Sequence, residues 1–217
     1  MASRRPTSMP AATDIRPAGA DRRARQSRGH ARRDLILAEA VEILAARGFR
    51  GTSIAELAKR VGMTHPGLLY YFGSKERLLH EVVSERERME GAAYYGTHPD
   101  SEASLANITE IAQLIADSPT FTRLYVVLAA ENLDPGEPLH DFFTDRYARA
   151  RDLVAAAVRA DMARGEVRKG TDPAQIAREV VATLMGLEIQ WLMDPDEIDY
   201  VATIEAFTEG LRARLAP

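Results

Sequence analysis

A short stretch of the chain carries four side chains suited to contacting nucleic acid: His65, Tyr70, Tyr71 and Lys75. An imidazole or a phenol can hydrogen-bond to a base edge or a phosphate, a tyrosine ring can contact a thymine methyl group, and a lysine can neutralise a phosphate. A lone exposed histidine or lysine is usually only solvated. The meaning of these residues therefore depends on the elements that present them.

The segment from residue 52 to residue 79 predicts two short helices joined by a glycine turn and followed by the start of a third. Ser53 opens the first helix with a capping box, because a glutamate stands three residues later. Gly62 ends that helix, and Thr64 starts the next with Pro66 in its first turn, where a missing amide hydrogen does no harm. This is a helix-turn-helix, whose second helix can enter a DNA major groove.

The faces of the second helix follow from its spacing. Leu68 and Phe72 lie four residues apart and should pack inward. Thr64 can cap the helix, contact a phosphate, or both. His65 is the best candidate for a base edge on the groove floor. The residues left facing the groove or its walls are His65, Gly67, Tyr70 and Tyr71.

Several motifs occur in a fixed order over nearly fifty residues: Arg47-Gly48-Phe49, Thr52-Ser53-Ile54, Gly62-Met63-Thr64, Leu68-Leu69-Tyr70-Tyr71-Phe72 and Ser74-Lys75-Glu76. With them, residues 33–80 resemble the DNA-binding domain of the TetR family of bacterial transcriptional repressors. The resemblance implies that the aromatic positions and Lys75 contact the DNA backbone. The predicted DNA-binding set is Arg33, Ser53, Thr64, His65, Gly67, Tyr70, Tyr71 and Lys75.

Three positions depart from the family pattern. Many members have Gly, Thr and Tyr where this chain has Pro66, Gly67 and Leu69. Leu69 cannot make the phosphate contact of a tyrosine hydroxyl, and Gly67 reads no base through a side chain, although it lets the backbone approach closely. These departures leave the operator sequence open, but not the binding of DNA.

Charge is divided unevenly along the chain. Residues 1–80 hold 15 Lys and Arg against 7 Asp and Glu, a net charge of +8, and the remainder carries −12, which gives the total of −4. A basic amino-terminal part suits a polyanion, and an acidic body keeps the rest off nucleic acid. With no cysteine among 217 residues, and with no apolar run long enough to cross a membrane, we expect a cytoplasmic protein without a membrane partner.

The periodicity predicts an all-α fold, with an N-terminal three-helix helix-turn-helix domain followed by a larger helical ligand-binding and dimerisation domain. Residues 1–30 read as a disordered Arg-rich arm, 31–80 as the DNA-binding domain, and 81–217 as the effector-binding and dimerisation domain. The arm could track phosphates or a minor groove, or it could be a solubilising tail; both interpretations stay open.

The last two predicted helices, residues 173–191 and 195–215, carry broad apolar surfaces and should pack antiparallel. As the family resemblance implies, two such pairs would form the interface of a homodimer. The alternative is that these surfaces close the domain's own core.

The resemblance also implies a small-molecule effector site in the body. Large side chains on its helices could enclose a cavity, and the alternative role of each one is to fill the apolar core. The candidate ligand-binding residues are Asn107, Phe121, Tyr125, Phe142, Tyr147 and Trp191. The dimer would have two states that differ in how its two DNA-binding domains are arranged. A ligand that prefers the state unable to bind DNA would shift the equilibrium toward it, and in this family it most often releases a repressor from its palindromic operator.

Two alternatives belong to other classes of protein. An enzyme is disfavoured, because the five histidines form no spaced ligand set and no nucleophile elbow, P-loop or dinucleotide fingerprint is present. We expect no metal and no cofactor. A helical adaptor that binds protein through its helix-turn-helix is disfavoured by the basic amino-terminal segment.

Overall fold

The computed structural model describes residues 18–97 and 103–217, and it places the side chains of residues 29–88 and 103–217. The described residues form α1 (Ala18–Arg47), α2 (Ile54–Arg60), α3 (His65–Phe72), α4 (Lys75–Thr97), the 3₁₀ turn η1 (Leu105–Asn107), α5 (Ile108–Ala116), α6 (Pro119–Glu131), α7 (His140–Arg164), α8 (Pro173–Met193) and α9 (Tyr200–Leu215). No strand occurs among them, and the all-α prediction is confirmed. The chain break expected at residues 98–100 lies outside the described residues.

Side-chain caps fix where several helices begin. Ser74 accepts a hydrogen bond from the Arg77 amide at 3.1 Å, at the start of α4. Asp172 accepts one from the Ala174 amide at 2.9 Å, with proline in the first turn of α8. A cap of this kind satisfies an amide that would otherwise have no partner at the helix start. The positions of these two starts agree with the sequence prediction.

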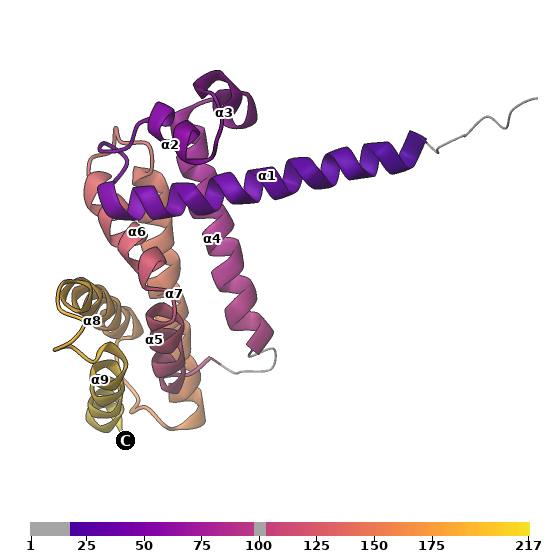
Figure 1. Cartoon of the computed structure of the whole chain (residues 1–217). Coiled ribbons are helices and arrows are strands. Elements are labelled where there is room, and N and C mark those ends of the chain that lie inside the picture. The colour runs from indigo at the N-terminus through magenta and orange to yellow at the C-terminus, as the bar shows by residue number, and fades with distance from the viewer. Residues whose placement is uncertain (1–17, 98–102) are drawn as a thin grey trace, which may run out of the picture.

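The amino-terminal arm predicted for residues 1–30 is wrong for residues 18–30, because α1 already begins at Ala18. Figure 1 shows this part of α1 projecting beyond the other helices. Alanine, arginine and glutamine have high helix propensity, and a helix nucleated by a packed segment extends at little cost. Residues 1–17 lie outside the described residues.

Two apolar cores hold the helices together. The first joins α1, α2, α3 and α4 to α6 and the start of α7, and includes the fully buried Ile36, Leu68 and Leu124. The second joins η1, α5 and α7 to α8 and α9 around Tyr200 and Ile204. The boundary expected after residue 80 falls within α4, and the first core extends across it. The DNA-binding helices and the body therefore share buried apolar surface.

The last two helices pack antiparallel, and each also packs against an earlier helix of the body. α8 packs chiefly against α7, and α9 packs chiefly against α5. α8 and α9 contact each other at both ends: the rings of Trp191 and Tyr200 stack beside the connecting turn with centroids 5.4 Å apart, and Arg214 near the end of α9 pairs with Glu179 near the start of α8 at 2.5 Å. The prediction of antiparallel packing is confirmed, and each helix also buries apolar surface against an earlier helix of the body. Among the described helices, none combines the length and apolar character that crossing a membrane requires.

Candidate nucleic-acid interface

The helix-turn-helix is built from two short capped helices. Ser53 accepts a hydrogen bond from the Glu56 amide at 3.1 Å, as the capping box predicted, while the Glu56 carboxylate pairs with Arg47. Thr64 caps α3 in the same way and accepts from the Gly67 amide at 3.2 Å. Both hydroxyls are thus used within the chain, although each also lies on the surface.

The turn between α2 and α3 depends on Gly62, which has a φ of 64°. This left-handed conformation costs a glycine little, and it lets the Met63 amide donate to the Ala58 carbonyl at 2.8 Å. Arg32 of α1 donates to the carbonyl oxygens of Val61 and Gly62, at 2.6 and 3.4 Å. Arg32 was not singled out from the sequence, because its role in holding the turn depends on a contact across the fold.

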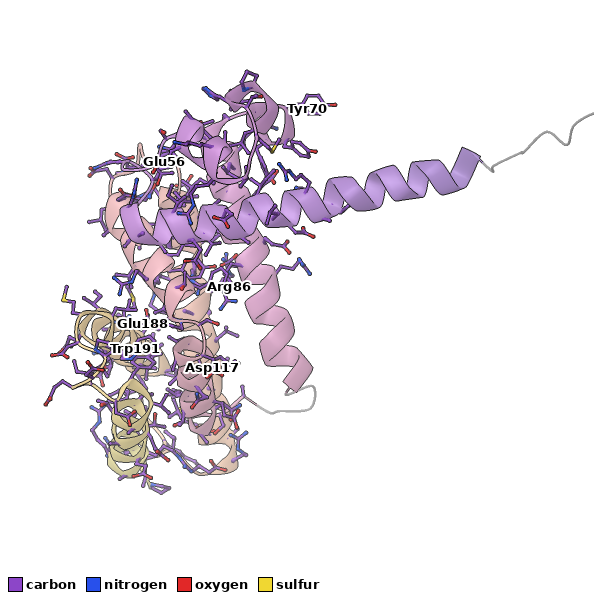
Figure 2. The ribbon with its side chains drawn as sticks, viewed as in Figure 1. Glu56, Tyr70, Arg86, Asp117, Glu188 and Trp191 are labelled. Atoms are coloured by element: carbon purple, nitrogen blue, oxygen red, sulfur yellow. The ribbon has the colours of Figure 1, made fainter. Side chains whose placement is uncertain are left out.

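The two faces of α3 divide as predicted. Leu68 and Phe72 are buried in the first core. Tyr70 is 89% exposed and Tyr71 39% exposed, and their rings meet edge to face with centroids 6.1 Å apart. Figure 2 shows Tyr70 standing out from the end of the molecule. α3 has 8 residues. At a rise of 1.5 Å per residue it is about 12 Å long, which matches the width of a major groove.

The rest of the outer surface of α3 is open at its start. His65 and Thr64 are exposed, and Gly67 is half-buried beside them. A Cβ at Gly67 would lie 3.1 Å from the Thr64 hydroxyl oxygen, so a larger residue here would crowd the cap. The structure thus brings Thr64, His65, Gly67, Tyr70 and Tyr71 together on one helix with an accessible face.

Lys75 and Arg33 have partners inside the protein. The Lys75 ammonium donates a hydrogen bond to the Phe49 carbonyl and lies over the Phe49 ring. Burial lowers the pKa of Lys75, while the negative charges of Glu76 and Glu131 oppose the shift. Arg33 pairs with Glu81 of α4 at 2.5 Å and lies 5.9 Å from the centroid of the Phe72 ring. Both residues hold α3 and α4 in place.

The aromatic residues expected to bind a ligand are only partly gathered. The rings of Tyr125, Phe142 and Tyr147 contact that of Phe143 at the edge of the first core, with Tyr125 and Phe143 centroids 6.1 Å apart. Phe121 packs against the same core. Two arginines cover this group, since Arg86 lies 3.9 Å from the Phe121 ring centroid and Arg146 lies 4.2 Å from that of Tyr125. Burial raises the pKa of Tyr147, and the charge of Glu188 adds to this shift.

The other two candidates lie elsewhere. Trp191 packs against the second core, and Asn107 ends η1, which belongs to the same core. A surface cleft of about 310 Å³ lies where α1, the first turns of α6 and the end of α8 meet. Its lining residues are Glu42, Ala45, Ala46, Pro119, Thr120, Arg123 and Leu192, and none of the six candidates is among them. Within the part of the chain that the structure describes, no group of three acidic or histidine side chains could hold a metal ion.

Two family models match the chain. Residues 36–82 match the model of "Bacterial regulatory proteins, tetR family". Residues 105–216, more than half of the chain, match the carboxy-terminal model of the "BetI-type transcriptional repressor". The first match covers the helices of the candidate interface, and the second covers η1 and α5 to α9.

Individual relatives agree with these models. The chain is 25% identical over 200 residues to the HTH-type transcriptional regulator TtgR of Pseudomonas putida, an alignment that covers 84% of this chain and 91% of the relative. A transcriptional regulator of Saccharomonospora viridis, solved in complex with choline, superposes with a TM-score of 0.70 at 21% identity, over 82% of this chain and 94% of that one. FadR of Bacillus subtilis, solved with stearoyl-CoA, gives 0.68 at 17% identity, over 80% and 94%.

Proposed function

The chain belongs to the TetR family of bacterial regulatory proteins, and we propose that it is a repressor that binds a palindromic operator as a homodimer until a small-molecule effector releases it. Family membership makes it a DNA-binding, ligand-responsive transcriptional regulator and not an enzyme. Such a role places the protein in the cytoplasm, beside the DNA it reads.

The exposed face of α3 carries the proposal for DNA. His65 at the first turn is assigned to a base edge, and Tyr70 and Tyr71 to phosphates and thymine methyl groups. Thr64 and Ser53 present their hydroxyls at helix starts, where a phosphate is favoured by free amides. Gly67 allows the backbone to approach the DNA closely. Buried Leu68 and Phe72 support this assignment, because they fix which side of α3 faces outward.

Lys75 and Arg33 are proposed to contact the DNA backbone, although each already has a partner within the protein. For either to bind a phosphate, it must exchange a partner in the protein: the Phe49 carbonyl for Lys75, and the Glu81 carboxylate for Arg33. We propose that both contribute chiefly by orienting α3, and that a phosphate competes for their charge when DNA is bound.

The homodimer is proposed to form through α8 and α9. On α8, the exposed Ile189 and Met193 leave apolar surface in contact with water. On α9, Ala202, Ala206 and Gly210 are exposed at four-residue intervals, so small side chains line one face of the helix. Small residues let a partner helix approach closely, and a two-fold axis would bring the same faces of two copies together.

The effector is proposed to bind beside α4, among Phe121, Tyr125, Phe142 and Tyr147. α4 begins next to α3 and continues along the body, where it carries Arg86 (Figure 2). The Arg86 guanidinium lies over the Phe121 ring. A ligand that separates Arg86 from the Phe121 ring would move α4, and with it α3. Asn107 and Trp191 would contact only a ligand that reaches the second core. The two ligands named for structural neighbours differ in chemistry, and at such low identity they define no ligand for this chain.

The test is a titration of a fluorescent mixed-sequence duplex with the purified protein, followed by anisotropy at several salt concentrations. We expect an affinity that falls steeply, by about 10³-fold or more between roughly 50 and 200 mM salt if six or more phosphates are neutralised. An absence of binding to any duplex at low salt would favour the protein-adaptor alternative.

A further inference from the structure

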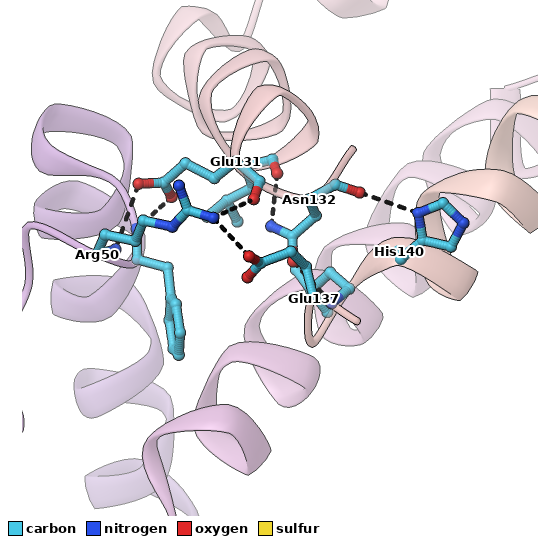
Figure 3. A network of polar contacts seen from close by, with 8 residues as sticks. Arg50, Glu131, Asn132, Glu137 and His140 are labelled. Atoms are coloured by element: carbon cyan, nitrogen blue, oxygen red, sulfur yellow. Dashed lines mark hydrogen bonds and ion pairs between the residues drawn. The ribbon is translucent and has the colours of Figure 1, made fainter. Parts of the chain in front are cut away.

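The last residue of α6, Glu131, binds the corner of the chain that follows α1. Its carboxylate oxygens accept hydrogen bonds from the backbone amides of Phe49 at 2.6 Å and Arg50 at 3.3 Å (Figure 3). The two segments lie more than eighty residues apart in the sequence. The corner leads directly into α2, so this contact joins the helix-turn-helix to the body.

The backbone of the corner is shaped to receive the carboxylate. Gly48 has a φ of 70°, and a Cβ at this position would lie 2.3 Å from a carboxylate oxygen of Glu131. The corner's carbonyls also have partners, because Thr52 donates to Gly48 O at 2.7 Å and Lys75 donates to Phe49 O. The ends of α1 and α6 and the start of α4 therefore meet at one point.

Local helix electrostatics do not explain a carboxylate at this place. A negative charge is unfavourable at the carboxy-terminal end of a helix, and Glu131 is the last residue of α6. Two backbone amides and the nearby charge of Lys75 compensate, and all three belong to the helix-turn-helix side of the junction. The position of Glu131 is thus favourable only while the helix-turn-helix (the head) stays packed against the end of α6.

A second contact lies beside the first. Arg50 donates to the Glu137 carboxylate at 2.5 Å and to the Glu131 carbonyl at 3.4 Å (Figure 3). Asn132 orders the loop that carries Glu137, because its side chain donates to Leu128 O at 2.7 Å and accepts from the Leu139 amide at 2.8 Å. In the Arg50–Glu137 pair the arginine is exposed and the glutamate is half-buried, so water screens the pair and it stabilises the junction only weakly.

We infer that Glu131 is a positioning residue, which fixes the orientation of the helix-turn-helix on the body and so sets the spacing of half-sites that the dimer accepts. The apolar packing of α1 on α6 is non-directional and tolerates small rotations. Hydrogen bonds to two consecutive amides are directional and do not. The inference rests on the proposed dimer and operator.

The consequence for DNA is geometric. One inserted base pair moves a half-site by roughly 3.4 Å and turns it by about 35° around the helix axis. A head held in a single orientation cannot follow this change, whereas a head that rotates on its apolar contact can follow part of it.

The experiment compares operators whose central spacer is one base pair shorter, unchanged or one base pair longer. The proteins are the wild type, Glu131→Gln and the control Glu137→Gln, which removes the ion pair at the same corner but no amide contact. We expect the wild type and the control to lose about tenfold or more in affinity on each altered spacer. We expect Glu131→Gln to lose less than about threefold, because glutamine offers one acceptor oxygen instead of two.

Equal spacer profiles for the wild type and Glu131→Gln would overturn the inference, and so would a control as tolerant as Glu131→Gln. A wild type that binds no duplex at all would instead overturn the proposed function. Amide exchange in the free proteins gives an independent readout that needs no DNA. The Phe49 and Arg50 amides should exchange about tenfold faster in Glu131→Gln than in the wild type. Unchanged exchange of these two amides would show that the carboxylate does not hold them.

Discussion

The ammonium of Lys75 lies over the ring of Phe49, with Nζ 4.0 Å from the ring centroid, and it donates a hydrogen bond to the carbonyl of the same residue. One lysine at the start of α4 thus binds both the side chain and the backbone of the corner after α1. Cation–π contact and a charge-assisted hydrogen bond each stabilise a fold, most strongly where water is partly excluded. A lysine that the sequence assigned to a phosphate therefore also supports the interface.

Replacing Lys75 by alanine should affect stability as well as DNA binding. We expect Lys75→Ala to lower the free energy of unfolding by about 1–2 kcal/mol, because it removes both contacts with Phe49. It should also weaken binding to operator and mixed-sequence duplexes by similar factors. Denaturant unfolding and anisotropy on both duplexes measure the two effects. Unchanged stability would contradict the internal role of Lys75.

His65 and Tyr71 should differ in how they affect binding. We expect His65→Ala to reduce the preference for operator over mixed-sequence DNA by about tenfold, since a base contact provides about 1–3 kcal/mol of discrimination. Tyr71→Phe removes one hydroxyl and should weaken binding to both duplexes alike. Competition binding with the two duplexes separates these effects. An unchanged preference in His65→Ala would remove this residue from base recognition.

The hydroxyl of Tyr200 should destabilise the fold. Tyr200 is 2% exposed, its hydroxyl has no hydrogen-bond partner among the described residues, and burial raises its pKa. Because the pKa of Tyr200 is higher in the folded than in the unfolded state, the free energy of unfolding is unaffected by this group below pH ~10 and falls above it, where the unfolded tyrosine ionises. We therefore expect unfolding to become easier as the pH rises above about 10.

Tyr200→Phe should raise Tm by about 2–4 °C at neutral pH, because it removes an unpaired buried hydroxyl. It should also reduce the loss of stability above pH ~10. Tyr70→Phe is the matched control, since that side chain is 89% exposed and its hydroxyl should not affect Tm. Circular dichroism melts at neutral pH and above pH ~10 measure both effects. A lower Tm in Tyr200→Phe would show that the hydroxyl is bound after all.

A charge on the exposed face of α8 should disrupt the dimer. Met193 is 80% exposed in the single chain, and we expect Met193→Glu to raise the dimer dissociation constant by about tenfold or more by burying an unpaired charge. Leu153→Glu is the control, because Leu153 is also an exposed apolar residue, at 63%, and lies on α7, outside the proposed interface. Sedimentation velocity over a concentration series gives both constants. Equal constants for the two variants would contradict an interface through α8.

Local features of the interface were predictable because they depend on near neighbours in the sequence. Ser53, Thr64 and Ser74 cap helices that begin within one residue of them. Leu68 and Phe72 lie inward because helical spacing and apolar character agree. In a short helix, two buried positions determine which face points outward, so the exposure of Tyr70 could be predicted.

Features that depend on distant residues were not predictable. The partner of Lys75 comes from the corner after α1, that of Arg33 from α4, and that of the Phe49 and Arg50 amides from α6. No periodicity in a single segment indicates such pairs. The early start of α1 was missed because Pro, Gly and Ser around it read as an arm, whereas helix extension from a packed segment prevailed. The contacts of α8 with α7 and of α9 with α5 likewise join segments that no local pattern pairs.

The most direct test of the account is selection of binding sites from a random duplex pool by the purified protein at near-physiological salt. We expect a palindrome whose half-sites lie about one helical turn apart or a multiple of it, as two α3 helices related by a two-fold axis require. Recovery of a single half-site, or of no sequence above background, would contradict a dimer that reads an operator through α3.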